Sequence, residues 1–144
     1  MRLSRQGEYA LKAMLRLSKE FGNGPVQSSE IAEKEHIPRK FLEQILVVLR
    51  RSGLLRSRRG VGGGHELARD PADISMAEII RAVDGPIAPL DCVSRVAYRK
   101  CPEESVCGLR GVLLEVRNAT AVILEETSCA DICAGRWKKL HGSG

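Results

Sequence analysis

The stretch that decides the fold is residues 37–68, IPRKFLEQILVVLRRSGLLRSRRGVGGGHELA. In its first half, apolar residues at positions 42, 45, 46 and 49 follow the spacing of one face of an amphipathic helix. That helix is predicted to begin at Pro38 and to end at Ser52 and Gly53. In its second half, two short segments flank a glycine-rich tip and predict a β-hairpin of about three to five residues per arm. We therefore expect a helix followed directly by a hairpin.

Two further helices are expected ahead of this stretch. A short helix is capped by Ser28, carries Ile31 and Ala32 on its buried face and ends at residues 36–38. A longer helix before it ends at the sequence GNGP, and its apolar stripe consists of Ala10, Ala13, Met14, Leu17 and Phe21. Two short helices joined by a tight turn form a helix-turn-helix. The hairpin extends it to a winged helix whose recognition helix lies within residues 39–55.

The positive charge is concentrated in this first half of the chain. Residues 1–69 contain 14 Lys and Arg against 7 Asp and Glu, whereas residues 70–144 contain 9 against 11. Five of the arginines lie at positions 50–59. Such asymmetry is typical of a phosphate-binding module joined to a regulatory or assembly module, although a solvated basic face gives the same counts. Double-stranded DNA is therefore the expected partner.

Side chains that contact DNA are expected on the recognition helix and the wing. A glutamine can pair with adenine in the major groove, and an arginine fits a narrow minor groove. The glycines between positions 60 and 64 lack the GKS or GKT ending of a nucleotide-binding loop, and we expect them to let the wing tip approach a phosphate backbone. The predicted DNA-binding residues are Ser28, Arg39, Lys40, Phe41, Gln44, Arg50, Arg58, Arg59 and Gly60.

The second half of the chain predicts two more helices around a polar loop. Ser75 caps a helix with Ile79, Ile80 and Val83 facing inward, and prolines at positions 86 and 89 open the loop. A long helix follows over residues 109–126 and has two apolar faces. One face can pack on its own domain and the other needs a partner, which favours a homodimer. Burial of both faces within one subunit is the alternative.

Together these elements predict a mainly α fold, a winged helix-turn-helix with a small β-hairpin wing and a long C-terminal dimerisation helix. We expect a DNA-binding domain over residues 1–84, and a cysteine-containing sensor loop and dimerisation helix over residues 85–144. No Ser/His/Asp arrangement, paired carboxylates in an evident cleft or cofactor fingerprint is present, so an enzyme is not expected. The sequence shows neither a signal peptide nor an apolar run near the roughly 18 residues of a membrane span. We expect a cytoplasmic protein with no membrane partner.

The five cysteines are the remaining candidates for metal binding or redox chemistry. Cys92, Cys101 and Cys107 lie in the polar loop with the spacing C-x8-C-x5-C, which lacks the CxxC pairs of structural zinc sites. An odd number of cysteines in a reducing compartment argues against a disulfide framework, and leaves a metal site, a redox switch or plain burial. Cys129 and Cys133 lie four apart on a short helix, where burial is the first expectation and a second redox pair the other.

Nearly the whole chain resembles the Rrf2 family of bacterial winged-helix transcriptional regulators, including its IscR-like and NsrR-like members. The resemblance is carried by MRLSRQGEYALKAML at the start, IAEKEHIPRKFLEQIL, LRRSGLLRSRRGVGGGHEL, DISMAEIIRAVDG and the cysteine loop. It implies a homodimeric repressor that senses iron–sulfur status, nitric oxide or redox state. It also implies that Cys92, Cys101 and Cys107 hold an iron–sulfur cluster, of the 2Fe-2S or 4Fe-4S type.

The resemblance also bears on the fourth coordination position of that cluster. Part of the family fills it with a histidine three residues after the third cysteine, where this chain has Arg110, whose guanidinium has no free lone pair. Other members use an acidic residue near the start of the first helix, which corresponds to Glu8, donated by the partner subunit. His36 is the reserve ligand. A cluster-free, thiol-based regulator of cysteine or redox metabolism and a winged-helix protein-interaction module are the alternative functions.

Overall fold

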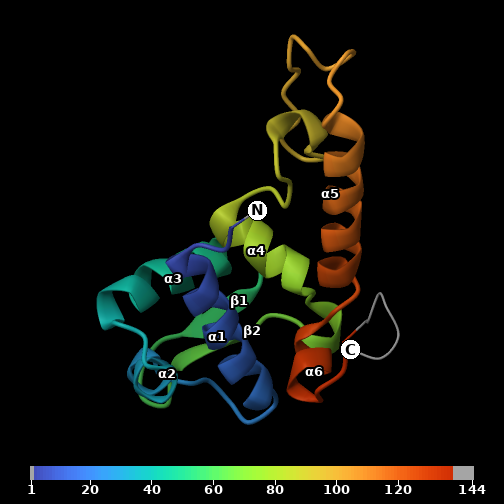
Figure 1. Cartoon of the computed structure of the whole chain (residues 1–144). Coiled ribbons are helices and arrows are strands. Elements are labelled where there is room, and N and C mark those ends of the chain that lie inside the picture. The colour runs from blue at the N-terminus through green and yellow to red at the C-terminus, as the bar shows by residue number, and fades with distance from the viewer. Residues whose placement is uncertain (1, 138–144) are drawn as a thin grey trace.

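The structure is a computed structural model that describes residues 2–137. Its elements form one winged-helix body with a projecting helical arm (Figure 1). In chain order they are α1 Arg5–Lys19, α2 Ser28–Glu35, α3 Arg39–Arg51, β1 Leu55–Arg58, β2 Gly64–Leu67, η1 Pro71–Asp73, α4 Met76–Asp84, η2 Asp91–Val93, α5 Arg110–Glu125 and α6 Cys129–Cys133, where η denotes a short 3-10 helix. This arrangement confirms the predicted mainly α fold with a small hairpin wing.

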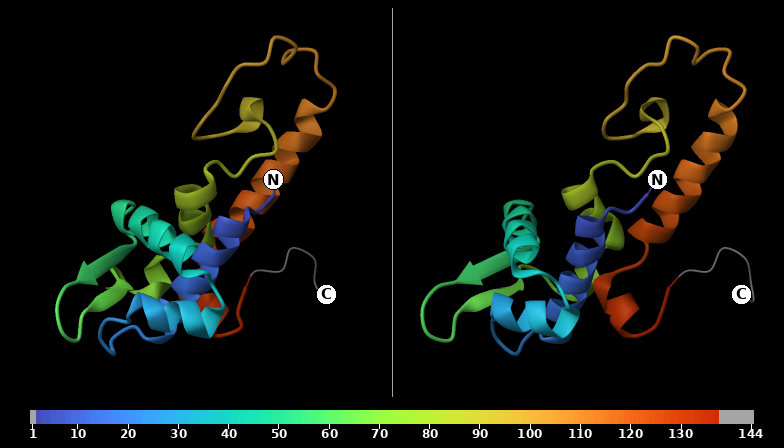
Figure 2. Two further views of the ribbon diagram at one scale, coloured as in Figure 1. Left: turned by 90° about the vertical axis from the view of Figure 1, so that its left-hand side faces the viewer. Right: turned by 60° about the vertical axis from the view of Figure 1, so that its left-hand side comes forward.

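The body is held together by one apolar core between α1, α3, α4 and the base of the hairpin. The predicted apolar faces supply it, because burying them removes the largest apolar area from water. Fully or almost fully buried side chains include Met14, Leu17, Ile31, Leu42, Ile45, Leu46, Leu49, Leu67, Ile74 and Ile79. The face of α3 opposite to this core points into solvent, beside the hairpin (Figure 2).

The helix ends agree with the predictions in part. Ser75 caps α4 as predicted, in a capping box with Glu78. Ser28, predicted as the cap of α2, is instead its first helical residue, and Gln27 occupies the cap position. The Ser28 hydroxyl donates to Oε1 of Glu43, a residue of α3, at 2.9 Å and does not accept from an amide of α2. Pro38 likewise lies one residue before α3, since its ψ of 132° is extended.

Two turns fix the geometry of the helix-turn-helix and of the wing. His36 ends α2 in the left-handed conformation, with φ 55°, and the chain enters α3 three residues later, at Arg39. β1 and β2 pair antiparallel from Leu55 with Leu67 to Arg58 with Gly64. Phe21, predicted to extend the buried stripe of α1, is 43% exposed because the helix ends at Lys19.

The arm consists of α5 and the cysteine loop, which lies at the far end of α5 from the body (Figure 1). After α5 the chain returns, and α6 packs against α1. Two backbone hydrogen bonds fix this return, from Met76 N to the Thr127 carbonyl and from Cys129 N to the Ile74 carbonyl, both 2.9 Å. The division into residues 1–84 and 85–144 stays a prediction, and residues 138–144 lie outside the described part. Within residues 2–137, no helix has the length and apolar character needed to cross a membrane.

Candidate functional site

Four of the predicted DNA-binding side chains lie on the solvent face of α3. Arg39, Lys40, Gln44 and Arg50 are exposed there, while Leu42 and its apolar neighbours bury the opposite face. Arg39 is 3.7 Å from Glu43, and Arg50 donates to Ser57 Oγ of β1 at 3.4 Å. The helix therefore presents three cations and one amide on a rigid support, which is the arrangement that a major groove accepts.

Phe41 differs from its neighbours on α3. Its ring is half-buried and stacks on Tyr9 of α1, with ring centroids 6.4 Å apart, and Lys40 Nζ lies 5.1 Å from the same ring centroid. The ring thus ties α3 to α1 and orients Lys40. Its predicted place near base edges stays a prediction.

The wing carries Arg58, Arg59 and Gly60 on its exposed side. Glu66 of β2 pairs with Arg58 at 3.0 Å, whereas Arg59 at the tip has no carboxylate partner among the described residues. Glycine is required at position 63, because a Cβ atom there would lie 2.3 Å from the Arg58 carbonyl oxygen. The tip is therefore a tight turn, with the backbone of Gly63 against that of Arg58.

An open depression of about 430 Å³ lies between the starts of α2 and α3 and the wing, and we call it the wing depression. It brings together four predicted residues, Ser28, Arg39, Arg58 and Gly60. It also contains residues that the sequence analysis missed, because their proximity depends on the packing of the hairpin against α2. The complete lining is Gln27, Ser28, Ser29, Arg39, Arg58, Gly60, Gly63, Gly64 and His65.

The three loop cysteines are free and partly exposed. Cys92 lies on η2, and it lines a shallow depression together with Cys101. Cys107 lies three residues before α5. Among residues 2–137, no three His, Cys, Asp or Glu side chains are gathered closely enough to hold a metal ion. The structure therefore places all three thiols on one loop but does not assemble them into a centre.

Arginines of α5 anchor the loop beside Cys92. Arg110 Nη2 donates to the Cys92 carbonyl at 3.3 Å, and Arg117 Nη1 donates to the Val93 carbonyl at 2.8 Å. Glu104 connects the far side of the loop, since it accepts from the Tyr98 hydroxyl at 2.6 Å and lies 3.7 Å from Arg110 Nε. The sequence analysis assigned no role to these residues, although the spacing of 110 and 117 places both on one helix face.

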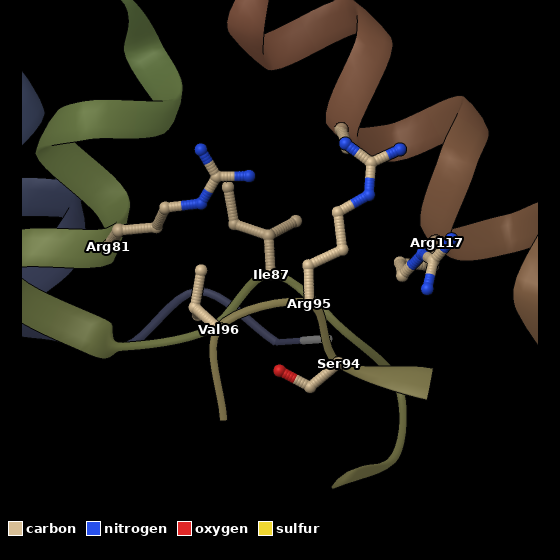
Figure 3. Close-up of a pocket in the computed structure, with 7 residues that line it drawn as sticks. Arg81, Ile87, Ser94, Arg95, Val96 and Arg117 are labelled. Atoms are coloured by element: carbon tan, nitrogen blue, oxygen red, sulfur yellow. The ribbon is translucent and has the colours of Figure 1, made fainter. Parts of the chain in front are cut away.

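The junction between α4, α5 and the loop is lined by three arginines around Ile87 (Figure 3). Arg81 of α4 pairs with Glu125 of α5 at 2.6 Å, and Arg95 of the loop lies 3.9 Å from the same carboxylate. A second tie joins α4 to the start of α1, because Ser4 N donates to Asp84 Oδ2 at 2.9 Å and the Ser4 hydroxyl also contacts Asp84. The loop is thus connected through α5 and α4 to the body.

The two other predicted ligands lie away from the loop cysteines within one subunit. Glu8 is exposed on the first turn of α1 and pairs with Lys12 at 3.2 Å. His36 is exposed in the turn between α2 and α3. Neither joins a group of possible metal ligands among the described residues.

The two cysteines of α6 have different surroundings. Cys129 is fully buried, and burial raises the pKa of its thiol to about 11, against an opposing contribution from a hydrogen bond with Ser18. Cys133 is exposed, with its Sγ 3.9 Å from the Leu15 carbonyl. The expectation of burial is correct for Cys129 and wrong for Cys133, which lies at the end of α6 and keeps most of its thiol in solvent although it contacts α1.

Known proteins resemble this chain over nearly its full length. Residues 3–135 match the Rrf2 family, described as an iron-dependent transcriptional regulator. An rrf2-like HTH-type transcriptional regulator of Rhodobacter capsulatus is 39% identical over 138 residues, which cover 92% of each chain. CymR, the global cysteine regulator of B. subtilis, has a similar structure, with a TM-score of 0.77, 31% identity and coverage of 94% of this chain and 98% of CymR. IscR of T. potens gives a TM-score of 0.76 at 29% identity, over 100% of this chain and 94% of IscR.

Proposed function

Because this chain belongs to the Rrf2 family of transcriptional regulators, we propose that it is a homodimeric repressor whose affinity for DNA is set by an iron–sulfur cluster on Cys92, Cys101 and Cys107. Rrf2 regulators act by binding DNA and are not enzymes. The observation that carries the proposal is the placement of three free thiols on one loop, which α5 anchors on the carbonyls of residues 92 and 93.

The exposed cations of α3 and the wing support the DNA-binding role. They are exposed on the side of α3 opposite to the core and on the wing, next to the wing depression. Phosphate contacts from such side chains fix the register of a protein on DNA, and Gln44 and Arg59 supply the predicted contacts to base edges and to the minor groove.

The free apolar face of α5 supports the dimer. Leu109, Val112 and Val116 are 65%, 58% and 46% exposed, although α5 also packs against α4 and η2. Only Ala121 of this helix is buried in the single subunit, so the alternative of burial on both sides does not hold. A second copy of α5 would cover this face, and a two-fold axis would place two recognition helices on successive turns of DNA.

The thiols fit an iron–sulfur cluster by their chemistry, because soft sulfur donors on a flexible loop are the usual ligands of such clusters. A bound cluster would supply an iron centre that reacts with nitric oxide and oxidants. Since the described residues do not gather three such ligands, binding is expected to require the loop to close. We assign the fourth position to Glu8 of the second subunit, whose carboxylate is exposed and held only by an i,i+4 pair with Lys12.

Anaerobic purification tests the proposal through the visible absorption spectrum and the iron and sulfide content. The expected protein is coloured, and changing Cys92, Cys101 or Cys107 to Ala abolishes the colour, whereas Cys129→Ala and Cys133→Ala retain it. Glu8→Ala is expected to alter the spectrum, the cluster lifetime and the DNA affinity. If all three are unchanged, Glu8 is not a ligand and His36 becomes the next candidate.

A cluster-free thiol regulator is the second candidate, and one observation favours it. The loop thiols are free and partly exposed, and within residues 2–137 the three are not gathered into one group, as suits thiols that react with an oxidant without a metal. The likeness to CymR, a cysteine regulator, is compatible with this candidate. A protein that stays colourless after anaerobic reconstitution, yet loses DNA affinity on treatment with peroxide, would replace the cluster proposal with this one.

A further inference from the structure

We propose that the wing depression seats one phosphate of the DNA backbone and that His65 takes up a proton when this phosphate is bound. The inference rests on the proposed DNA binding. It adds a binding residue that the sequence analysis did not assign, and it makes the affinity for DNA depend on pH.

Three segments of the chain supply donors to the depression. The start of α2 contributes Ser28 and Ser29, α3 contributes Arg39, and the wing contributes Arg58 and His65. Gln27 makes no side-chain hydrogen bond to the first turn of α2, whereas Ser4 and Ser75 do so for α1 and α4. Glu30 N donates to the Gln27 carbonyl at 3.0 Å, so the amides of Ser28 and Ser29 are the first-turn donors of α2 that remain for an anion.

His65 is held rigidly at the back of the depression. The His65 N–H donates to the Val26 carbonyl at 2.7 Å, and the Val26 N–H donates to the His65 carbonyl at 2.8 Å. His65 also pairs with Ser57 across the hairpin. Its Nδ1 atom is buried and has no hydrogen-bond partner among the residues that the structure describes. A buried polar nitrogen without a partner costs stability, which is a feature of sites that acquire a partner on binding.

In the free protein, both guanidinium groups that line the depression are already in ion pairs. Arg39 lies 3.7 Å from Glu43, which also accepts from Ser28, and Arg58 lies 3.0 Å from Glu66. These two carboxylates offset the two guanidinium groups that line the depression. Glu66 is shared with Arg56 of β1, which lies 4.0 Å from the same oxygen, and Arg50 of α3 is a further cation near the ring. A phosphate that enters therefore brings a negative charge that the existing pairs do not compensate fully.

His65 can supply the missing positive charge. Burial lowers the pKa of its imidazole below the ordinary value of 6.5, with Glu43 acting in the opposite direction and Arg50 in the same one. The ring is thus mainly neutral at neutral pH before DNA binds. A phosphate in the depression favours the charged imidazolium, which donates from both nitrogens. The pKa is then higher in the complex than in the free protein.

This difference sets the direction of the pH effect. The complex binds one more proton than its free components between the two pKa values, so affinity rises as the pH falls through the higher, bound-state pKa. Affinity levels off below the lower, free-state pKa, where His65 is already charged in both states. We expect the gain in affinity to be about threefold to tenfold for each depression.

The test uses the full-length protein and a duplex recovered by selection from random DNA. Affinity is measured from pH 6.0 to 8.5 at constant ionic strength, and calorimetry in two buffers of different ionisation enthalpy counts the protons. We expect proton uptake and tighter binding at low pH in the parent, and the loss of both in His65→Gln. Glu33→Gln, which removes an exposed carboxylate of α2 outside the depression, is the matched control that retains both.

Replacing single phosphates of the duplex by neutral methylphosphonates locates the contact. At one position in each half-site, the replacement is expected to weaken the parent at pH 6.5 by a larger factor than it weakens His65→Gln, which keeps the other donors of the depression. An NMR titration of the His65 ring in the parent, with and without DNA, gives the same answer if the variant does not fold. Equal His65 pKa values in the two states overturn the inference even if DNA binding itself is intact. The absence of any selected duplex overturns the proposed function instead.

Discussion

At the scale of single residues, Arg59 and its neighbour Arg58 have different roles because of one carboxylate. Glu66 holds Arg58 against the hairpin, while the guanidinium of Arg59 is exposed and has no such partner within residues 2–137. Binding DNA therefore costs Arg59 no existing ion pair, and its place at the wing tip suits a narrow minor groove.

Arg59→Ala is expected to weaken binding to the selected duplex by about 1–3 kcal/mol while the fold stays intact. The loss should shrink as salt is raised, because part of it is electrostatic. Quantitative gel shift or fluorescence anisotropy measures the effect. Arg136→Ala, which removes an exposed arginine at the other end of the molecule, serves as the control and should bind like the parent. Equal affinities of Arg59→Ala and the parent would remove Arg59 from the interface.

Gly7 shows how a tertiary contact reverses a helix propensity. In an exposed helix, Gly→Ala stabilises by about 1 kcal/mol, because alanine loses less backbone entropy. At position 7, however, the added Cβ would lie 2.4 Å from Asp84 Oδ2, the atom that accepts from Ser4 N.

Gly7→Ala is therefore expected to destabilise the protein by about 1–3 kcal/mol, as measured by chemical or thermal unfolding. The double variant Gly7→Ala/Asp84→Ala should be more stable than Asp84→Ala alone, since the clash with the carboxylate is then absent and the remaining close atom, Leu3 Cδ1 at 2.8 Å, is the end of an exposed side chain that can move. If Gly7→Ala stabilises the parent, the contact with Asp84 has no role in the stability of α1.

At the scale of elements, α5 has two faces with different partners. One face carries Arg110 and Arg117, which bind the loop, and Ala121, which is buried. The other carries the exposed apolar side chains of Leu109, Val112 and Val116. A single helix thus connects the loop to the proposed dimer interface.

Val112→Glu and Val116→Glu should each shift the protein from dimer to monomer, because burying an unpaired carboxylate costs more than the lost apolar contact. Sedimentation equilibrium over a range of concentrations measures the change. Val61→Glu places the same charge on the fully exposed wing tip and should leave the mass unchanged. A parent that is monomeric at micromolar concentrations would exclude this interface.

At the scale of the whole molecule, a continuous set of contacts joins the loop to the DNA-binding body. The loop is bonded to α5, Glu125 of α5 pairs with Arg81 of α4, and Asp84 at the end of α4 binds Ser4 before α1. Spatial continuity alone does not establish energetic coupling, so the connection needs a measurement on a variant.

Asp84→Ala is expected to speed amide hydrogen exchange in the first turn of α1, because Ser4 loses two acceptor contacts. It should also reduce the ratio of DNA affinities between the two signalling states of the loop, whichever chemistry distinguishes them. Asp91→Ala removes an exposed carboxylate at the start of η2 and serves as the control for the loss of a negative charge. If exchange speeds up and the affinity ratio is unchanged, the signal does not pass through the start of α1.

The sequence by itself determined the elements and the types of chemistry. Apolar spacing predicted α3 and its buried Leu42, Ile45, Leu46 and Leu49, the glycines predicted the wing, and the loop cysteines were evident from their positions alone. Each of these depends on residues a few positions apart, where helix and hairpin geometry fixes the distances. The tertiary structure decided what those residues touch. Ser28 binds Glu43 and is not a helix cap, Ser4 binds Asp84, which is eighty residues away in the sequence, and His65 lines the depression together with Arg39. Such contacts follow from how whole elements pack, since side-chain proximity between distant segments is set by the core that they bury together.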